Sequence, residues 1–342
     1  MVPAETLFRS FHNEGPGRGF DILRSGALRP PAGFTPNSRA RALAGLIEQI
    51  AFVLMMDQLR MLSIHAHPDD ESSKGAATTA KYTDNGAHAT LVCATGGEEG
   101  DILNPAVNTP EVIADLFNVR MAELKMATDI IGYDIVEMLG YRDSGMKDSD
   151  ANEHPDCFWA APMAESTARF ATMIRTFRPH VVISYGDPMG GYDHPDHVRV
   201  WEITDPAIEL AADPTADLEG EPWQVLKLYN SMWSKARMVA THEKYEELGL
   251  ESPFDKRWLD RPDHDHMITT RINVQGWYQR RSDALLAHAT QVDPTSPFWF
   301  GLPDDVMAAL NNEECFERVW SKVEAAMPET DMFAGIEVAT HG

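Results

Sequence analysis

The chain has 342 residues, of which 43% are hydrophobic and 24% are charged, which is typical of a globular protein. Its formal charge of −24 would repel phosphate backbones, and no run of about 18 apolar residues is present, so we expect neither nucleic-acid binding nor a membrane span. The three cysteines, Cys93, Cys157 and Cys315, form no C-x-x-C pair. This argues against a thiolate zinc site and a disulfide framework, and it predicts a cytoplasmic protein.

Residues 1–54 differ in composition from the rest of the chain. They contain six arginines and no lysine, and the glycine- and proline-rich stretches at 15–19 and 29–33 are typical of irregular linkers. We hypothesise that they form a poorly ordered extension and that Met55 or Met56 is the natural start. Residues 55–342 would then form a single catalytic domain.

From residue 59 onward, short apolar runs alternate with amphipathic stretches. The apolar runs predict strands at 59–64, 89–94, 134–139, 181–185, 225–230 and 267–272. The amphipathic stretches predict helices at 73–85, 111–131, 163–177, 196–212, 235–248 and 275–288. This alternation predicts an α/β fold, a Rossmann-like and mostly parallel sheet with helices on both faces.

Two histidine-rich motifs follow predicted strands. The first is HAHPDDE at 65–71, directly after the first strand, and the second is GGYDHPDH at 190–197, after the fourth. In open α/β sheets, ligands bind beyond the carboxyl ends of the strands. We therefore expect both motifs to contribute to one site at the C-terminal ends of the strands.

The residue types suit a catalytic metal, which usually takes three protein ligands and keeps one position open. His67 and Asp70 are three apart, so one helical turn after Pro68 places both side chains on the same side. His194 or His197 can supply the third ligand.

The remaining groups of the two motifs suit proton transfer. Asp69 points away from its neighbour Asp70 and is free to act as a general base toward water. The histidine that does not bind metal can protonate a departing amine, and Tyr192 can donate a hydrogen bond to a developing oxyanion. Glu71 and Asp193 are expected to orient the histidine rings. Together these groups indicate metal-assisted amide hydrolysis.

Other polar clusters have simpler interpretations. We interpret His154-Pro155-Asp156 as a surface loop, His264 and His266 as part of a solvated turn, and His65 as a core residue of the first strand. Cys93 is expected to be buried in the second strand. The glycine-rich loop at 96–100 is either a plain turn or part of the substrate site.

The paired motifs HPDDE (67–71) and HPDH (194–197) resemble the LmbE/PIG-L superfamily of zinc-dependent N-deacetylases. The stretches at 65–76, 95–105, 140–146 and 287–294 carry the resemblance, which runs from about residue 59 to 303. Residues 1–54, the acidic insert at 148–153 and the tail after 303 match this family poorly.

The resemblance implies a role for each residue that matches the family's motifs. The zinc ligands would be His67, Asp70 and His197, with one ion per chain; Fe²⁺ suits two histidines and a carboxylate nearly as well. Asp69 would be the general base, His194 the acid or charge stabiliser, and Tyr192 would lie beside the scissile carbonyl. The substrate would be a small molecule whose sugar-inositol part contacts Arg120 and Asp143, with Glu98 and Lys74 also in the binding site.

Lys74 and the stretch at 100–105 resemble the amidase branch of the family most closely. That branch hydrolyses the amide between glucosaminyl-inositol and the cysteine of mycothiol S-conjugates, a detoxification of electrophiles. One alternative is the deacetylase that acts on N-acetyl-glucosaminyl-inositol, and an alternative of another class is a non-catalytic carbohydrate- or metal-binding module. The aromatic residues Phe158, Trp159, Trp299 and Phe300 either line a pocket for the variable adduct or pack in the core. The sequence does not predict the oligomeric state.

Overall fold

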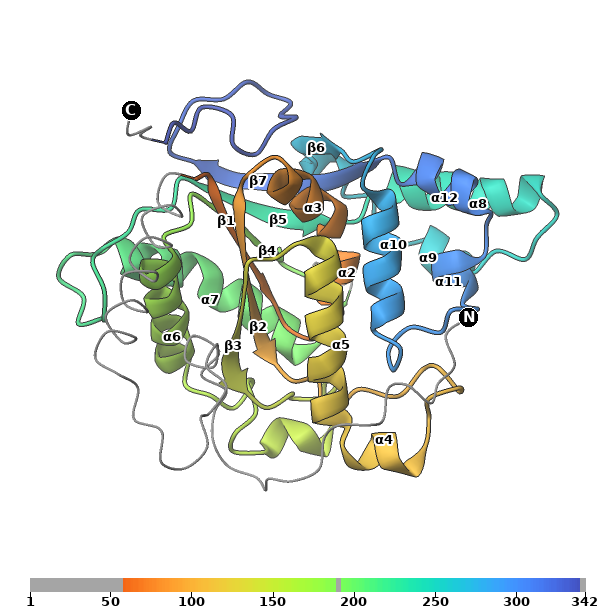
Figure 1. Cartoon of the computed structure of the whole chain (residues 1–342), viewed down its shortest axis with the longest axis horizontal. Coiled ribbons are helices and arrows are strands. Elements are labelled where there is room, and N and C mark those ends of the chain that lie inside the picture. Colours follow the sequence, from red (N-terminus) through yellow and green to blue (C-terminus); the bar gives the residue numbers. More distant parts are fainter. Residues whose placement is uncertain (1–57, 189–191, 339–342) are drawn as a thin grey trace, which may run out of the picture. The chain divides into compact units, whose positions relative to one another are not determined.

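The computed structural model describes residues 58–188 and 192–338, and within them seven strands form one sheet (Figure 1). The strands are β1 (Arg60–His65), β2 (His88–Thr95), β3 (Ile135–Tyr141), β4 (Val181–Ser184), β5 (Lys227–Met232), β6 (Thr270–Asn273) and β7 (Glu313–Ser321). Their order is β3-β2-β1-β4-β5-β7-β6, in which β3 to β5 are parallel and β7 runs antiparallel to both β5 and β6. The predicted fold class is therefore confirmed, whereas the hypothesis about residues 1–54 lies outside the described residues.

The central strands are apolar on both faces, as parallel strands covered by helices must be. In β1, Met61 contributes to one core cluster, and Leu62 and Ile64 contribute to the other. In β4, Ile183 contributes to the first cluster and Val182 to the second. Successive side chains of a strand point to opposite faces, so the sheet has a hydrophobic core on each side.

Helices cover both of these faces (Figure 1). Residues of α3 (Ala76–Asp84), α5 (Leu116–Ile131) and α10 (Tyr278–Ala287) contribute to the first core cluster. Residues of α6 (Met163–Phe177) and α7 (Pro195–Ala212) contribute to the second. Pro195 at the first position of α7 suits a helix start, because its missing N–H would have no partner there.

The sequence predicted the six strands β1 to β6 but missed β7, whose sequence EECFERVWS mixes polar and apolar residues. The helix predicted at 73–85 is interrupted, because Gly75 adopts a φ of 102° between α2 (Asp70–Ser73) and α3. The helix predicted at 111–131 also divides, into α4 (Pro110–Ala114) and α5, at Asp115. The other four predicted helices are present with small differences at their ends.

The remaining helices lie in the C-terminal part of the chain. They are α8 (Lys235–Glu247), α9 (Lys256–Leu259), α11 (Pro297–Phe300) and α12 (Asp304–Leu310), and there are 3-10 turns at Asp150–Glu153 and Asp265–Met267. Tyr245, Tyr278, Leu302 and Met307 form a small separate core between these helices and α10. None of the described helices is both long and apolar enough to span a bilayer.

Candidate active site

The first motif forms a tight turn beyond the end of β1. His67 lies two residues past the strand, and α2 begins at Asp70. Asp69 precedes this helix with a φ of 120°, a conformation that is strained for a residue other than glycine. Its backbone N–H donates to Glu71 Oε2 at 2.9 Å, which helps to hold the turn. As a result, the carboxylates of Asp69 and Asp70 have different surroundings, as the sequence predicted.

His67, Asp70 and His197 come together as a group able to hold a metal ion. One ligand atom from each residue lies within 4.8 Å of the other two, and all three residues are buried. Asp70 Oδ2 accepts hydrogen bonds from the His67 backbone N–H at 3.0 Å and from the Tyr185 hydroxyl at 2.8 Å, and it lies 3.4 Å from His197 Nε2. Lys74 Nζ donates to the other oxygen of Asp70. The structure thus assembles the three residues that the resemblance assigned to the metal.

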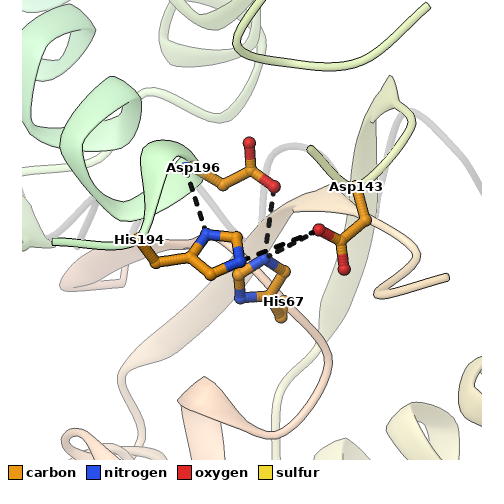
Figure 2. Close-up of side chains that lie close together, drawn as sticks. All are labelled: His67, Asp143, His194 and Asp196. Carbon is orange, nitrogen blue, oxygen red and sulfur yellow. Dashed lines mark hydrogen bonds and ion pairs between the residues drawn. The ribbon is translucent and has the colours of Figure 1, made fainter. Parts of the chain in front are cut away.

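A second group shares His67 and contains Asp143, His194 and Asp196 (Figure 2). Nε2 of His67 lies 3.2 Å from Asp196 Oδ2 and 3.7 Å from Asp143 Oδ1. Nε2 of His194 lies 3.9 Å from the same Asp143 oxygen. The backbone N–H of Ser144 donates to Asp196 at 3.0 Å. Sequence reasoning gave Asp196 no role, although it lies inside the HPDH motif.

The charges of the site favour a cation. Burial alone would lower the pKa of His67, but hydrogen bonds and charge interactions with Asp143 and Asp196 raise it to about 10. Burial lowers the pKa of His197 well below the usual range and also lowers that of His194, so both rings are neutral near pH 7. The carboxylates that hold a proton on His67 would equally favour a divalent metal in place of that proton, and His197 is already neutral, so the residues present fit such an ion.

Asp69 has the surroundings of a general base. Its side chain is 30% exposed, and its Oδ2 accepts a hydrogen bond from Arg120 at 3.4 Å. Burial raises the pKa of Asp69 even though the Arg120 charge opposes the shift, and a raised carboxyl pKa suits proton transfer near neutral pH. The guanidinium of Arg120 is almost fully buried and also donates to the carbonyl oxygens of Pro68 and Gly97.

Gly97 explains why the glycine-rich loop contacts this arginine. It has a φ of 69°, and a Cβ at this position would lie 2.2 Å from Arg120 Nη1. Glu98 of the same loop accepts a hydrogen bond from the Asp143 backbone N–H at 3.0 Å. The loop therefore packs against the site and is more than a plain turn.

Tyr192 lies beside both histidines of the second motif. Its ring centroid is 4.9 Å from that of His197 and 5.9 Å from that of His194, and 55% of the residue is exposed. Figure 2 shows His194 between His67 and the start of α7, facing the centre of the group. Tyr192, His194 and Asp69 are therefore all close to the three residues His67, Asp70 and His197.

Two predicted orienting residues have other partners. Asp193 is exposed and pairs with Lys147 at 3.4 Å, so the prediction that it orients a histidine ring is wrong. Glu71 does contact a histidine ring, but that of His288, at 2.7 Å in a fully buried pair. The residue that contacts His67 is Asp196, as described above.

The remaining interpretations agree with the structure. His65 is fully buried in β1 and lies 3.1 Å from the Tyr185 hydroxyl, and Cys93 is buried in β2. His154 is exposed in a loop. His264 lies in a turn in which Asp265 accepts hydrogen bonds from the first backbone N–H groups of α8. Sequence reasoning also missed Tyr185, although a polar residue at the end of a predicted strand beside the motif was a usable signal.

Comparisons with known proteins agree with this arrangement. The family model described as PIG-L: GlcNAc-PI de-N-acetylase matches residues 62–208, which contain both motifs. A mycothiol S-conjugate amidase from Streptomyces coelicolor is 40% identical over 292 residues, which covers 82% of this chain and 99% of the relative. A 1D-myo-inositol 2-acetamido-2-deoxy-α-D-glucopyranoside deacetylase from Streptomyces scabiei is 37% identical, covering 81% of this chain and 90% of the relative.

The fold is also shared with a solved deacetylase. The N,N′-diacetylchitobiose deacetylase from Pyrococcus horikoshii superposes with a TM-score of 0.52 at 16% identity, covering 83% of this chain and 94% of the other. This likeness bears on the fold alone. The family model and the curated relatives lead to one conclusion: the chain belongs to the PIG-L family and is a hydrolase that acts on amide bonds.

Proposed function

We propose that this protein is a zinc-dependent amidase that cleaves mycothiol S-conjugates. The bond hydrolysed would be the amide between glucosaminyl-inositol and cysteine, and the products would be an N-acetylcysteine S-conjugate and the amino-sugar inositol. The observation that carries the chemistry is the buried group of His67, Asp70 and His197, with Asp69 and His194 beside it. The choice of substrate is supported by the similarity to an amidase of that name, which extends over 99% of that relative, and by Lys74 beside the metal group.

In this proposal His67, Asp70 and His197 hold one Zn²⁺, and Fe²⁺ is the alternative that suits the same donors. Such an ion supplies positive charge that lowers the pKa of water and polarises the scissile carbonyl. Lys74 and Tyr185 hold the Asp70 carboxylate in place through its two oxygens. Removing either contact should therefore weaken metal binding.

The protein's own groups would then move the protons. Asp69 takes a proton from the attacking water, and Arg120 fixes its orientation. His194, neutral at the start, relays the proton taken up by Asp69 to the departing amine and stabilises the charge that develops, while Tyr192 donates a hydrogen bond to the oxyanion. Both Tyr192 and His194 lie within contact range of the His197 ring, so all three can face one bound amide.

The sugar-inositol part of the substrate is assigned to Arg120, Asp143 and Glu98, with Lys74 nearer the acyl side. Because the guanidinium of Arg120 is buried against backbone carbonyls, we assign it two roles, fixing Asp69 and closing the base of the sugar site. We also assign the protein to the cytoplasm.

A second function has direct support from the comparisons. Relatives that are 34–38% identical are named as deacetylases of the acetamido-glucosyl inositol, and that reaction breaks an amide on the same sugar nitrogen. The same catalytic groups would serve both reactions, so only the acyl side of the substrate distinguishes them.

Product analysis by mass spectrometry separates these functions. The purified protein should convert a mycothiol S-conjugate faster than N-acetyl-glucosaminyl-inositol, and a chelator should stop both reactions. Faster release of acetate from the N-acetyl substrate would overturn the proposed amidase in favour of the deacetylase. Turnover that survives chelation would contradict metal dependence.

A further inference from the structure

Arg281 on α10 is a buried cation that has no hydrogen-bond or ion-pair partner among the described residues. It is 8% exposed, and its guanidinium makes neither a hydrogen bond nor an ion pair with any residue of 58–188 and 192–338. The adjacent Arg280, by contrast, pairs with Asp84 at 3.0 Å and donates to the Ile130 carbonyl oxygen at 2.8 Å. Burying an unpaired charge is costly, so a buried guanidinium usually has an acceptor.

The charges around Arg281 compensate this cation only in part. Burial lowers its pKa, and the nearby Arg237 lowers it further. Glu314 contributes an opposing negative charge, but its Oε2 already accepts a hydrogen bond from the Thr78 backbone N–H at 2.8 Å. The guanidinium therefore retains the capacity to bind one more acceptor oxygen.

Arg281 lines a narrow cleft that also includes Lys74, a neighbour of the metal group. Lys74 lines one part of this cleft, and Trp233, Arg237 and Glu314 line other parts. Lys74 also donates to Asp70, so one lining residue of the cleft contacts a proposed metal ligand. Its volume is about 10 Å³, which is room for one water-sized group such as a carbonyl oxygen.

Aromatic rings border the same cleft. The Cζ of Arg281 lies 5.5 Å from the centroid of the Trp299 ring, and Trp299 packs edge-on against Trp233 at 6.1 Å. Trp233 is 42% exposed, just past the C-terminal end of β5, so its indole presents apolar surface beside the cleft. An acceptor oxygen at Arg281 would therefore have an aromatic surface next to it.

We propose that Arg281 binds the acetyl carbonyl oxygen on the cysteine nitrogen of a mycothiol S-conjugate, with the sulfur substituent against Trp233 and Trp299. This inference rests on the proposed function and adds the subsite that selects its substrate. In the conjugate, a second carbonyl lies a few bonds beyond the scissile one. In N-acetyl-glucosaminyl-inositol the acyl group ends at its methyl, so that substrate has no second carbonyl oxygen that Arg281 could bind. The subsite therefore favours amidase over deacetylase turnover.

The test compares two substrates on the full-length, metal-loaded protein. The Arg281→Met variant should lower the ratio of kcat/KM for the conjugate to kcat/KM for N-acetyl-glucosaminyl-inositol by about tenfold or more, because a charge-assisted hydrogen bond is lost. The Arg280→Met variant is the matched control, since it removes the same charge from the adjacent position of the helix. Its ratio should stay within twofold of that of the unmodified protein. An unchanged ratio in Arg281→Met would overturn the inference.

A second measurement needs no variant. The unmodified protein should hydrolyse a conjugate that lacks the acetyl group on cysteine about tenfold less efficiently than the acetylated conjugate. Equal rates would refute the subsite even if Arg281→Met failed to fold. Failure of the proposed function would give a different result, in which the unmodified protein releases acetate from the N-acetyl substrate but leaves every conjugate intact.

Discussion

The C-terminal segment after β7 is joined to β5 by a buried ion pair. The Lys227 Nζ lies 2.6 Å from Glu329 Oε1, and the Tyr229 hydroxyl donates to Glu329 Oε2 at 2.5 Å. Arg318 and Thr270 also donate to Glu329, each at 3.3 Å. Both members of the pair are almost fully buried. We predict that Glu329→Gln lowers the free energy of unfolding strongly, because the change leaves the Lys227 charge buried and unpaired.

The expected loss is about 3–5 kcal/mol, the usual cost of removing one partner from a buried ion pair. This is a large share of the roughly 5–15 kcal/mol that stabilises a typical domain. A double variant, Lys227→Met with Glu329→Leu, should lose less than Glu329→Gln alone, since it removes both charges together. Equilibrium denaturation in urea measures these differences from the transition midpoints.

Glu324→Gln provides the control, because Glu324 is an exposed carboxylate in the same C-terminal segment. Its free energy of unfolding should change by no more than about 0.5 kcal/mol. A loss below about 1 kcal/mol for Glu329→Gln would refute the argument that the buried pair anchors the segment.

Two further predictions concern catalysis and pH. Asp69→Asn should lower kcat/KM for the conjugate by about 10²–10⁴-fold while the protein keeps its metal, and a loss of less than tenfold would remove Asp69 as the general base. Burial and the Arg60 guanidinium lower the pKa of His180 to about 4, so below about pH 6.5 the unfolded chain binds more protons than the folded chain. The contribution of His180 to the free energy of unfolding should therefore be fully present above pH 6.5. It should fall by about 3 kcal/mol as the pH drops to 4. His180→Asn should weaken that pH dependence in urea denaturation, and an unchanged slope would show that His180 does not cause it.

Much of the fold could be predicted because its strands have a simple pattern. Strands buried on both faces are continuous apolar runs, and β1, β2 and β4 appear at almost the predicted positions. The strand β7 could not be predicted in this way, because its alternating polar residues resemble a surface segment. The breaks at Gly75 and Asp115 depend on local backbone conformations that hydrophobic periodicity does not register.

The two motifs predicted which residues form the metal group, but they did not predict all the side chains that contact those motifs. His67, Asp70 and His197 meet because the ends of parallel strands lie along one edge of the sheet. The Asp196 contact with His67 depends on the orientation of the first turn of α7, and the Glu71 contact with His288 joins α2 to the end of α10. Such pairs across elements depend on tertiary packing. For the same reason, the burial of the Arg281 guanidinium beside Lys74 and Trp233 could not be predicted from the sequence.

The central claim is that His67, Asp70 and His197 hold the metal, although His67 also belongs to the group with Asp143, His194 and Asp196. The most direct test is the metal content per chain of His197→Ala and His194→Ala, measured side by side by elemental mass spectrometry. We predict that His197→Ala loses the ion, whereas His194→Ala keeps about one ion per chain and loses most of its hydrolytic activity. Loss of the ion from His194→Ala with retention in His197→Ala would contradict the account and assign the metal to the other group.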